Sequence, residues 1–440
     1  MLKTTIANGM KAPTAVIQMR DSSAIAPSSS TRIGSIDIVR GAVMLLMAID
    51  HVRVYSGLPA GGPTAGIFLT RWITHFVAPA FIFLAGTSAF LHGRKLASTG
   101  ALARFLLSRG LWLVFLELTI LRVTWTFNFD FSHYLLAGVI WVIGWCMVLL
   151  AGLIYLPVPA LTAFGLIIVL GHNIMDHYSK TLVPTIQNSH WSWVWQVFYF
   201  GGPVQIGEHG PTLFVLYSIV PWVGVMALGY VFGRVMIMDI GSRRKYCLAL
   251  GGAAIVLFLT LRGFNIYGDP RPWSPPAPAA SVQNNTSPGA APATSLAPRR
   301  PQAPAWISFL NTTKYPASLL FLLMTLGPML LALPLVEKAS GPIANGLMMF
   351  GRVPFFYYAL HIPLIHLAAI IVSVVRLGII SPWLFQNHPV LVPPAPPGYV
   401  WSLGLLYVVW VIIVAILYFP CRWFAALKAR RKDIGFLSYL

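Results

Sequence analysis

Charged residues are scarce in this sequence of 440 residues. Asp, Glu, Lys and Arg together make up 9% of it, whereas hydrophobic residues make up 57%. Soluble domains contain roughly 25% charged residues, so this composition excludes an ordinary soluble globular protein. Most of the chain is therefore expected to lie in lipid.

Acidic residues and cysteines are also few in this sequence. There are 11 Asp and Glu against 30 Lys and Arg, a formal net charge of +19. The cations fall in short clusters between apolar runs, which is typical of membrane topology rather than of a nucleic-acid surface, so no nucleic-acid partner is expected. The three cysteines, Cys146, Cys247 and Cys421, are far apart in the sequence. This spacing favours neither a disulfide framework nor a metal site.

Long apolar runs are what the sequence has in abundance. About 20 apolar residues in a helix cross the ~30 Å hydrocarbon core of a bilayer. Such runs, of which the fifth is short, lie at about 37–57, 68–93, 105–126, 136–156, 159–172, 212–236, 246–263, 315–336, 346–376 and 399–420. The sequence thus predicts an all-α fold: a polytopic transmembrane helical bundle of about ten spans.

Lys and Arg are more frequent on the side of these runs that holds both termini. The positive-inside rule then places both termini in the cytoplasm, and we expect a multi-pass protein of a bacterial inner membrane. Around a transmembrane domain at 34–421, segment 1–33 is expected to be a disordered cytoplasmic tail and 422–440 a basic cytoplasmic tail. Residues 268–304, rich in Pro, Ala and Ser, are expected to form a disordered extracytoplasmic loop.

Ionisable side chains stand out in the first predicted span because each costs at least ~2.5–3.5 kcal/mol at the bilayer centre. This span contains Asp37, Arg40, Asp50, His51 and Arg53. Spacings of three and four residues place Asp37, Arg40 and His51 on one helix face. Asp37 and Arg40 can form an i,i+3 ion pair, a structural alternative to a binding role. His51, at the outer end, is a candidate general base because imidazole titrates near neutrality.

Other predicted spans bring polar groups to the same outer level. They are Arg71 and His75 in the second span, Glu117 and Arg122 in the third, and Asn311, Lys314 and Tyr315 at the start of the eighth. Histidine, carboxylate and cations at one depth indicate a polar site that opens outward. His75 competes with His51 for the role of base.

Two histidines lie within the ninth predicted span, His361 and His366. Five residues separate them, so they point about 140° apart around a helix. This angle argues against a metal held by the pair, and no metal is expected. Tyr358 and His361 are expected to form hydrogen bonds between helices.

These stretches resemble a known family. SIDIVRGAVMLLMAIDHVRVY is similar to the first-span signature of membrane acyltransferases, an Asp-x-x-Arg followed by a His at the far end of the helix. GRVPFFYYALHIPLIH resembles their late-span motif, a Gly, then aromatic residues, then His-x-Pro. Within that superfamily the chain resembles bacterial relatives of heparan-alpha-glucosaminide N-acetyltransferase, through residues 75–91, 109–122, 217–234 and 309–328.

The resemblance implies transfer of an acyl group, expected to be acetyl, from cytoplasmic acyl-CoA to an acceptor across the membrane. The lysosomal enzyme of this family has its proposed reactive histidine in the loop after the first span. Here that loop, SGLPAGGPTAGIF, contains no histidine. His51, which matches the wider superfamily, and His75 are therefore the candidates. The expected acceptors are sugars of a glycan or glycolipid.

The site residues take the following expected roles. Arg40, with Asp37, binds the phosphates of acyl-CoA at the inner side. His51, oriented by Asp50 or Glu117, deprotonates a hydroxyl or amine or is itself acylated first. Lys314 or Arg122 is expected to stabilise the developing oxyanion, and Asn311 and Tyr315 are expected to lie beside them on the substrate side.

Two other classes of protein also fit part of the pattern. A transporter needs charges near the middle of the membrane, but it would be expected to show interrupted helices in matching halves. A non-catalytic assembly protein would not require the outer combination of His, carboxylate and Lys. Transfer or hydrolysis of labelled acyl-CoA distinguishes the enzyme from both.

Overall fold

The computed structural model describes residues 33–61, 64–187, 189–273 and 304–431. Most of the predicted tail 1–33 and of the predicted loop 268–304 lies outside these ranges. The last helix, α16 (Leu403–Arg430), continues into the segment predicted as a basic tail. The described residues from Gly34 onward form one compact unit.

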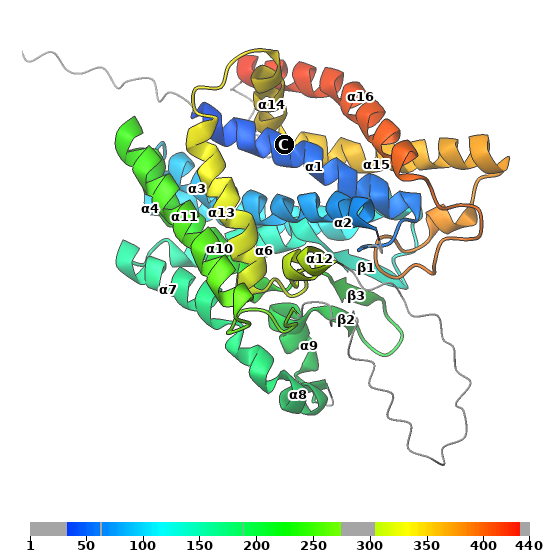
Figure 1. Ribbon diagram of the computed structural model, residues 1–440, viewed down its shortest axis with the longest axis horizontal. Helices are drawn as coiled ribbons and strands as arrows, with labels where there is room; N and C mark the ends of the chain where they lie inside the picture. The colour runs from blue at the N-terminus through cyan, green and yellow to red at the C-terminus, as the bar shows by residue number, and fades with distance from the viewer. Residues whose placement is uncertain (1–32, 62–63, 188, 274–303, 432–440) are drawn as a thin grey trace, which may run out of the picture. The chain divides into compact units, whose positions relative to one another are not determined.

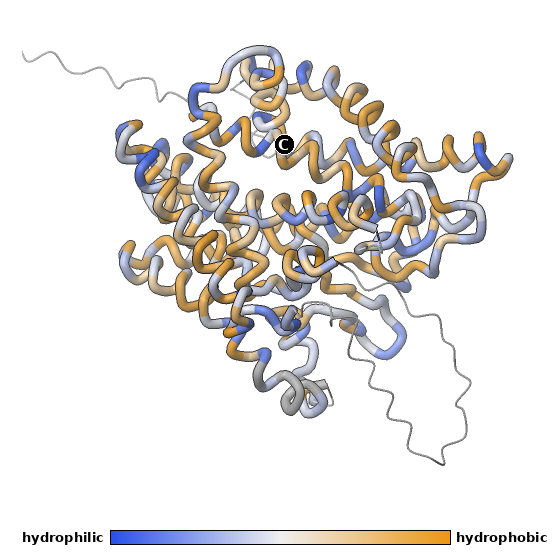
Figure 2. Tube along the Cα trace, viewed as in Figure 1, coloured by the Kyte–Doolittle hydropathy of each residue, from blue (hydrophilic) through white to orange (hydrophobic). Residues whose placement is uncertain are grey.

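The described chain is mostly helical, as predicted (Figure 1). Within the described ranges, six helical segments are long and apolar enough to cross a membrane: Ala65–Gly93, Val158–Asp176, Ile219–Met236 (α10), Ile240–Gly263 (α11), Pro354–Leu377 (α15) and Leu403–Arg430 (α16). Helices α6 (Val139–Leu153) and α13 (Leu319–Leu335) are apolar but shorter. Hydrophobic residues run along most of these helices in Figure 2. The fold is therefore that of an integral multi-pass membrane protein; ten crossings and the orientation of the termini stay predictions.

Three predicted spans differ in their construction. The second is one helical segment made of α2 (Ala65–Trp72), the 3-10 turn η1 (Ile73–Phe76) and α3 (Val77–Gly93). The ninth is two helices, α14 (Pro342–Arg352) and α15, because Pro354 lacks an N–H and disfavours helical backbone at the residue before it. The run at 212–236 begins as strand β3 (Thr212–Val215) and only then becomes α10.

Helix α1 (Gly34–Ser56) carries the first predicted span and packs against α14, α15, α16 and α3. Its contact with α14 depends on two glycines. A Cβ on Gly41 would lie 1.9 Å from the carbonyl oxygen of Leu347, and a Cβ on Gly351 would lie 1.9 Å from that of Asp37. Small residues allow helix backbones to touch in membranes, so only glycine fits at either position.

A small sheet was not predicted, and the all-α expectation is corrected here. Strands β1 (Tyr134–Ala137), β2 (Gly202–Gln205) and β3 form it in the order β1-β3-β2, with β1 and β3 parallel and β2 and β3 antiparallel. The remaining elements are α4 (Thr99–Leu116), the π-helical η2 (Glu117–Leu121), α5 (Arg122–Thr126), α7 (Val158–Gly171), α8 (Ile174–Gln187), α9 (Ser192–Trp195), η3 (Gln196–Phe200), α12 (Ala305–Leu310) and η4 (Pro382–Phe385).

Candidate active site

A cavity of about 530 Å³ lies at the C-terminal end of α1. Asp50 and His51 of α1 line it together with Arg71 of α2, Glu117 of η2 and Tyr358 of α15. Tyr315 and part of the connection between α15 and α16 complete the lining. Residues from the first, second, third, eighth and ninth predicted spans therefore meet in one cavity, as the sequence pattern indicated.

His51 contacts a second histidine in this cavity. Its Nδ1 lies 2.6 Å from Nε2 of His361, and the two rings stack with centroids 4.8 Å apart. Nδ1 of His361 lies 2.7 Å from the carbonyl oxygen of Tyr358 and 3.1 Å from that of Tyr357. Carbonyl oxygens only accept hydrogen bonds, so Nδ1 of His361 carries the proton.

This hydrogen bond fixes the tautomer of both neutral rings. Since Nδ1 of His361 is the protonated nitrogen, Nε2 of His361 is an acceptor, and Nδ1–H of His51 donates to it. The lone pair of His51 is then on Nε2. His51 lines the cavity, whereas the ring of His361 is fully buried. A neutral imidazole with a free lone pair can accept a proton or attack a carbonyl carbon.

The carboxylates expected to orient His51 make other contacts, and this corrects the prediction. Asp50 pairs with Arg53, whose Nε donates to Oδ1 at 2.9 Å. Arg53 also donates to the carbonyl of Leu58 at 3.1 Å. The orienting partner of His51 is His361 instead. Helical spacing alone could not identify it because it comes from a distant part of the chain.

Glu117 lies on the cavity at the point where α4 becomes π-helical. Such single-turn π segments are frequent at functional sites. The residue is 1% exposed, and its Oε1 lies 2.2 Å from where a Cβ on Gly138 would sit. The carboxylate thus packs directly on the backbone of Gly138. Among the described residues, no cation forms an ion pair with it.

Two cations lie at the same level. Arg71 lines the cavity directly. Lys314 is 7% exposed, its Nζ lies 5.2 Å from the ring centroid of Tyr315, and its charge acts on both Asp50 and His51. A buried ammonium acts strongly on nearby charge, which suits a place where negative charge develops or binds.

His75 differs from His51 in its surroundings. It is 4% exposed and packs edge-on against Phe321, with ring centroids 5.4 Å apart. It is not among the described residues that line the cavity. Of the two candidate histidines, His51 alone faces this cavity.

Arg122 is not placed to stabilise an oxyanion, which corrects that prediction. Its Nε donates to the carbonyl of Tyr134 at 3.1 Å, Nη1 donates to both the carbonyl and the side chain of Asn128 at 2.6 Å, and Nη2 donates to the carbonyl of Asp130. The residue is fully buried. These hydrogen bonds hold the turn between α5 and β1 in place, and they occupy the guanidinium of Arg122.

Asn311 is likewise placed away from the cavity. Its carbonyl accepts a hydrogen bond from Nη2 of Arg262 at 3.3 Å, and the residue is exposed. Like Arg122, Arg262 is a buried arginine that holds backbone carbonyls. A substrate contact through Asn311 is therefore not supported.

Asp37 and Arg40 lie at the other end of α1, roughly 21 Å and roughly 16 Å from His51 at 1.5 Å per residue. The predicted ion pair is confirmed, with Nη1 of Arg40 3.6 Å from Oδ1 of Asp37. Arg40 also donates to Ser88 Oγ at 2.7 Å and to the carbonyl of Gly351 at 3.4 Å. The arginine thus ties α1 to α3 and α14. Its binding of acyl-CoA stays a prediction.

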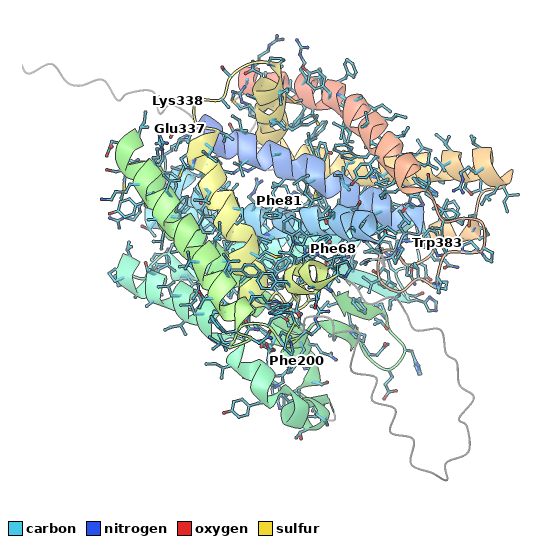
Figure 3. The ribbon with its side chains drawn as sticks, in the orientation of Figure 1. Phe68, Phe81, Phe200, Glu337, Lys338 and Trp383 are labelled. Carbon is cyan, nitrogen blue, oxygen red and sulfur yellow. The ribbon has the colours of Figure 1, made fainter. Side chains whose placement is uncertain are left out.

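The connection between α15 and α16 was missed by sequence reasoning. It contributes Trp383 and His388 to the cavity, and Figure 3 shows Trp383 on this connection. Nε2 of His388 lies 3.0 Å from the carbonyl of Trp383, and burial lowers the pKa of His388 to about 4. The segment has neither hydrophobic periodicity nor a charge cluster, so no signal pointed to it.

Comparison with known families agrees with the resemblance. The family model described as heparan-alpha-glucosaminide N-acetyltransferase, catalytic, matches residues 32–266, which is more than half of the chain. The matched region contains His51, Arg71 and Glu117. His361, Lys314 and the α15–α16 connection lie beyond it. No curated protein matches the chain.

Proposed function

Because the chain belongs to the heparan-alpha-glucosaminide N-acetyltransferase family, we propose that it moves an acetyl group from cytoplasmic acetyl-CoA to an extracytoplasmic acceptor. The acceptor group is a hydroxyl or amine of a glycan or glycolipid. The observation that carries this proposal is the His51–His361 pair, which leaves the lone pair of His51 Nε2 free in a cavity at the outer end of α1.

In this mechanism His51 is the base. Nε2 takes the proton as the acceptor oxygen or nitrogen attacks the thioester carbonyl, and the imidazolium returns that proton to the leaving thiolate. His361 accepts the Nδ1–H bond throughout, holds the ring in one orientation and stabilises the imidazolium. This is the role that a carboxylate has in a Ser-His-Asp triad.

The same lone pair serves a second route. Attack of Nε2 on the thioester carbon breaks the C–S bond and gives an acetyl-histidine and the CoA thiolate. The acceptor then attacks the acetyl carbon, which releases Nε2, and the acceptor proton passes to this freed nitrogen. The two routes differ in one observable. The acetyl-histidine route releases a burst of CoA without an acceptor, whereas direct transfer does not.

Charges around His51 support transfer chemistry. We assign stabilisation of the carbonyl oxygen to Lys314, because a buried ammonium acts strongly on charge that develops beside it. Tyr315 also lines the cavity.

We assign the phosphates of acetyl-CoA to the inner end of α1. Arg352 is the more available cation there: its side chain is 49% exposed and its Nε lies 4.0 Å from Asp37. Arg40 acts beside it but is partly occupied by Ser88 and Gly351. Between this end and His51, the thioester arm follows α1.

Acetyl transfer by the full chain in nanodiscs tests the function. The protein receives acetyl-CoA labelled in the acetyl group and glucosamine as a probe acceptor, and label on the amino sugar is measured together with free CoA. Acceptor-dependent label transfer is expected. Acetyl-CoA recovered intact, with no label on glucosamine and no release of free CoA, would contradict the proposal.

A further inference from the structure

The α15–α16 connection forms a large part of the cavity wall. Its lining residues include Trp383, His388, Val390, Val392, Pro393 and Ala395. They come from one stretch of 13 positions, 383–395, whereas α1 and α2 contribute the charges Asp50, Arg53 and Arg71. One part of the cavity is therefore charged, and another part is mostly apolar, with an aliphatic stretch at 389–395.

This wall is held firmly at the outer end of α1. The backbone N–H of Trp401 donates to the carbonyl of Ser56 at 3.0 Å, and the hydroxyl of Tyr399 donates to the carbonyl of Tyr55 at 2.7 Å. The side chain of Asn128 donates to the carbonyl of Phe385 at 2.7 Å. The segment is thus attached to α1 and to the turn after α5.

Hydrogen bonds inside the segment fix its shape as well. Nε1 of Trp383 donates to the carbonyl of Pro393 at 2.8 Å, and Nε2 of His388 donates to the carbonyl of Trp383. Asn387 and Leu391 form a β-bridge. The aliphatic surface therefore belongs to a segment of fixed shape, and this segment lines the same cavity as His51.

We propose that this wall selects the acceptor, and that the acceptor carries an aliphatic group next to the hydroxyl or amine that is acetylated. A fully hydrophilic sugar would lose hydration against Val390, Val392 and Pro393 without gaining hydrogen bonds there. An aliphatic group gains from the same contact. The inference rests on the proposed function and narrows its acceptor to an amphiphile.

The acceptor is a better occupant of the wall than the acyl donor. The family transfers acetyl, whose two carbons are too few to cover a wall of this extent. The segment also lies outside the region that the family model matches, which ends at residue 266. The family model therefore says nothing of this segment, and the inference rests on the contacts of this chain alone.

The test compares methyl and octyl β-D-glucosaminide as acceptors for the full chain in nanodiscs, below the concentration at which the octyl compound forms micelles. The octyl compound is expected to have a kcat/KM about tenfold or more higher, through KM, because it buries aliphatic surface on the wall. Val390→Thr/Val392→Thr should remove most of this preference with kcat unchanged. Threonine has the shape of valine, so the segment keeps its fold.

Leu391→Thr is the matched control. Leu391 lies between the two valines, but it is 42% exposed and is not among the described lining residues. This variant should keep the full octyl preference. Equal kcat/KM for the two acceptors, or a preference that survives in Val390→Thr/Val392→Thr, would overturn the proposal. A double variant that changes only the preference for octanoyl-CoA over acetyl-CoA would overturn it too, because the wall would then hold the donor.

Binding of tritiated octyl β-D-glucosaminide separates this inference from the proposed function. One outcome is that no acceptor is acetylated, the octyl compound binds more tightly than the methyl compound, and only Val390→Thr/Val392→Thr weakens binding of the octyl compound. This outcome supports selection of the acceptor by the wall and contradicts the transfer reaction. Transfer to both acceptors without preference supports the transfer reaction and contradicts selection by the wall. No transfer and no binding preference contradicts both.

Discussion

Nδ1 of His51 lies 2.6 Å from Nε2 of His361, although 310 residues separate the two in the sequence. The carbonyls of Tyr357 and Tyr358 fix the proton of His361, and His361 in turn fixes that of His51. A neutral histidine therefore takes the orienting role that carboxylates often have. No carboxylate needs to be desolvated beside the base for this role, which suits a site at the end of a membrane helix.

Loss of His361 should lower the rate without weakening substrate binding. We expect His361→Ala to reduce kcat for acetyl transfer about 10²-fold or more, with KM nearly unchanged. His361→Gln should restore part of the rate because its amide oxygen can accept the Nδ1–H bond of His51. Steady-state kinetics over a pH series checks this.

His366→Ala is the matched control for that series. His366 lies on the same helix and is also buried, but it stacks on Phe127 with centroids 3.9 Å apart and is not among the described cavity residues. Its kcat should stay near that of the parent protein. Equal losses in the two alanine variants would mean that His361 acts only through packing.

Arg122 should matter for stability and not for the chemical step. Arg122→Met removes the arginine donor from the carbonyls of Asn128, Asp130 and Tyr134, and the loss at the buried Tyr134 costs ~1–3 kcal/mol. A lowered Tm is expected, with kcat per folded molecule unchanged. Arg104→Met, at an exposed position of α4, should leave Tm unchanged. A 10²-fold loss of kcat in folded Arg122→Met would instead restore the oxyanion role.

Two glycines of α14 should respond in opposite ways to alanine. At Gly351 the new Cβ meets the backbone of Asp37, so the α1–α14 contact must open, at a cost of ~1–3 kcal/mol. At Gly346 a Cβ meets nothing within 4 Å, and alanine should stabilise the helix by ~0.5–1 kcal/mol. Thermal unfolding in detergent measures both. A Gly351→Ala protein as stable as Gly346→Ala would show that the helices do not pack this closely.

Acid should destabilise the α15–α16 connection through His388. Burial lowers the pKa of His388 to about 4, whereas an unfolded histidine titrates near ~6.5. The unfolded state therefore takes up the proton first as the pH falls. The contribution of His388 to stability is complete above about pH 6.5 and declines between 6.5 and 4. In Tm measurements from pH 7.5 to 4.5, His388→Gln should show a smaller decline than the parent protein. Parallel curves would contradict this assignment.

The sequence predicted the helices and the convergence of polar groups better than their individual contacts. Apolar runs mark helices because backbone polar groups in lipid must be satisfied within the segment. The charges of α1 and Glu117 stood out because their burial is costly. Strands of four residues, such as β1, are too short to show a period of two. The small sheet was missed for that reason.

The hydrogen-bond and ion-pair partners of the site residues could not be deduced from their spacing in the sequence. Asp50 is the sequence neighbour of His51, but Asp50 binds Arg53, which lies about one helical turn further along α1. The acceptors of Arg122 are mostly backbone carbonyls, and these have no sequence signature. His388 and the wall lie in a segment without periodicity, so only the folded chain shows that they line the same cavity as His51.

Acetyl transfer by His51→Ala and His75→Ala tests the central claim most directly. Both proteins are purified in nanodiscs, checked for folding by Tm, and given labelled acetyl-CoA with an amino-sugar acceptor. If Nε2 of His51 is the base or the nucleophile, His51→Ala should lose transfer at least ~10²-fold while it stays folded, and His75→Ala should keep it. Full activity in folded His51→Ala with loss in His75→Ala would move the chemistry to η1, and full activity in both would contradict the mechanism.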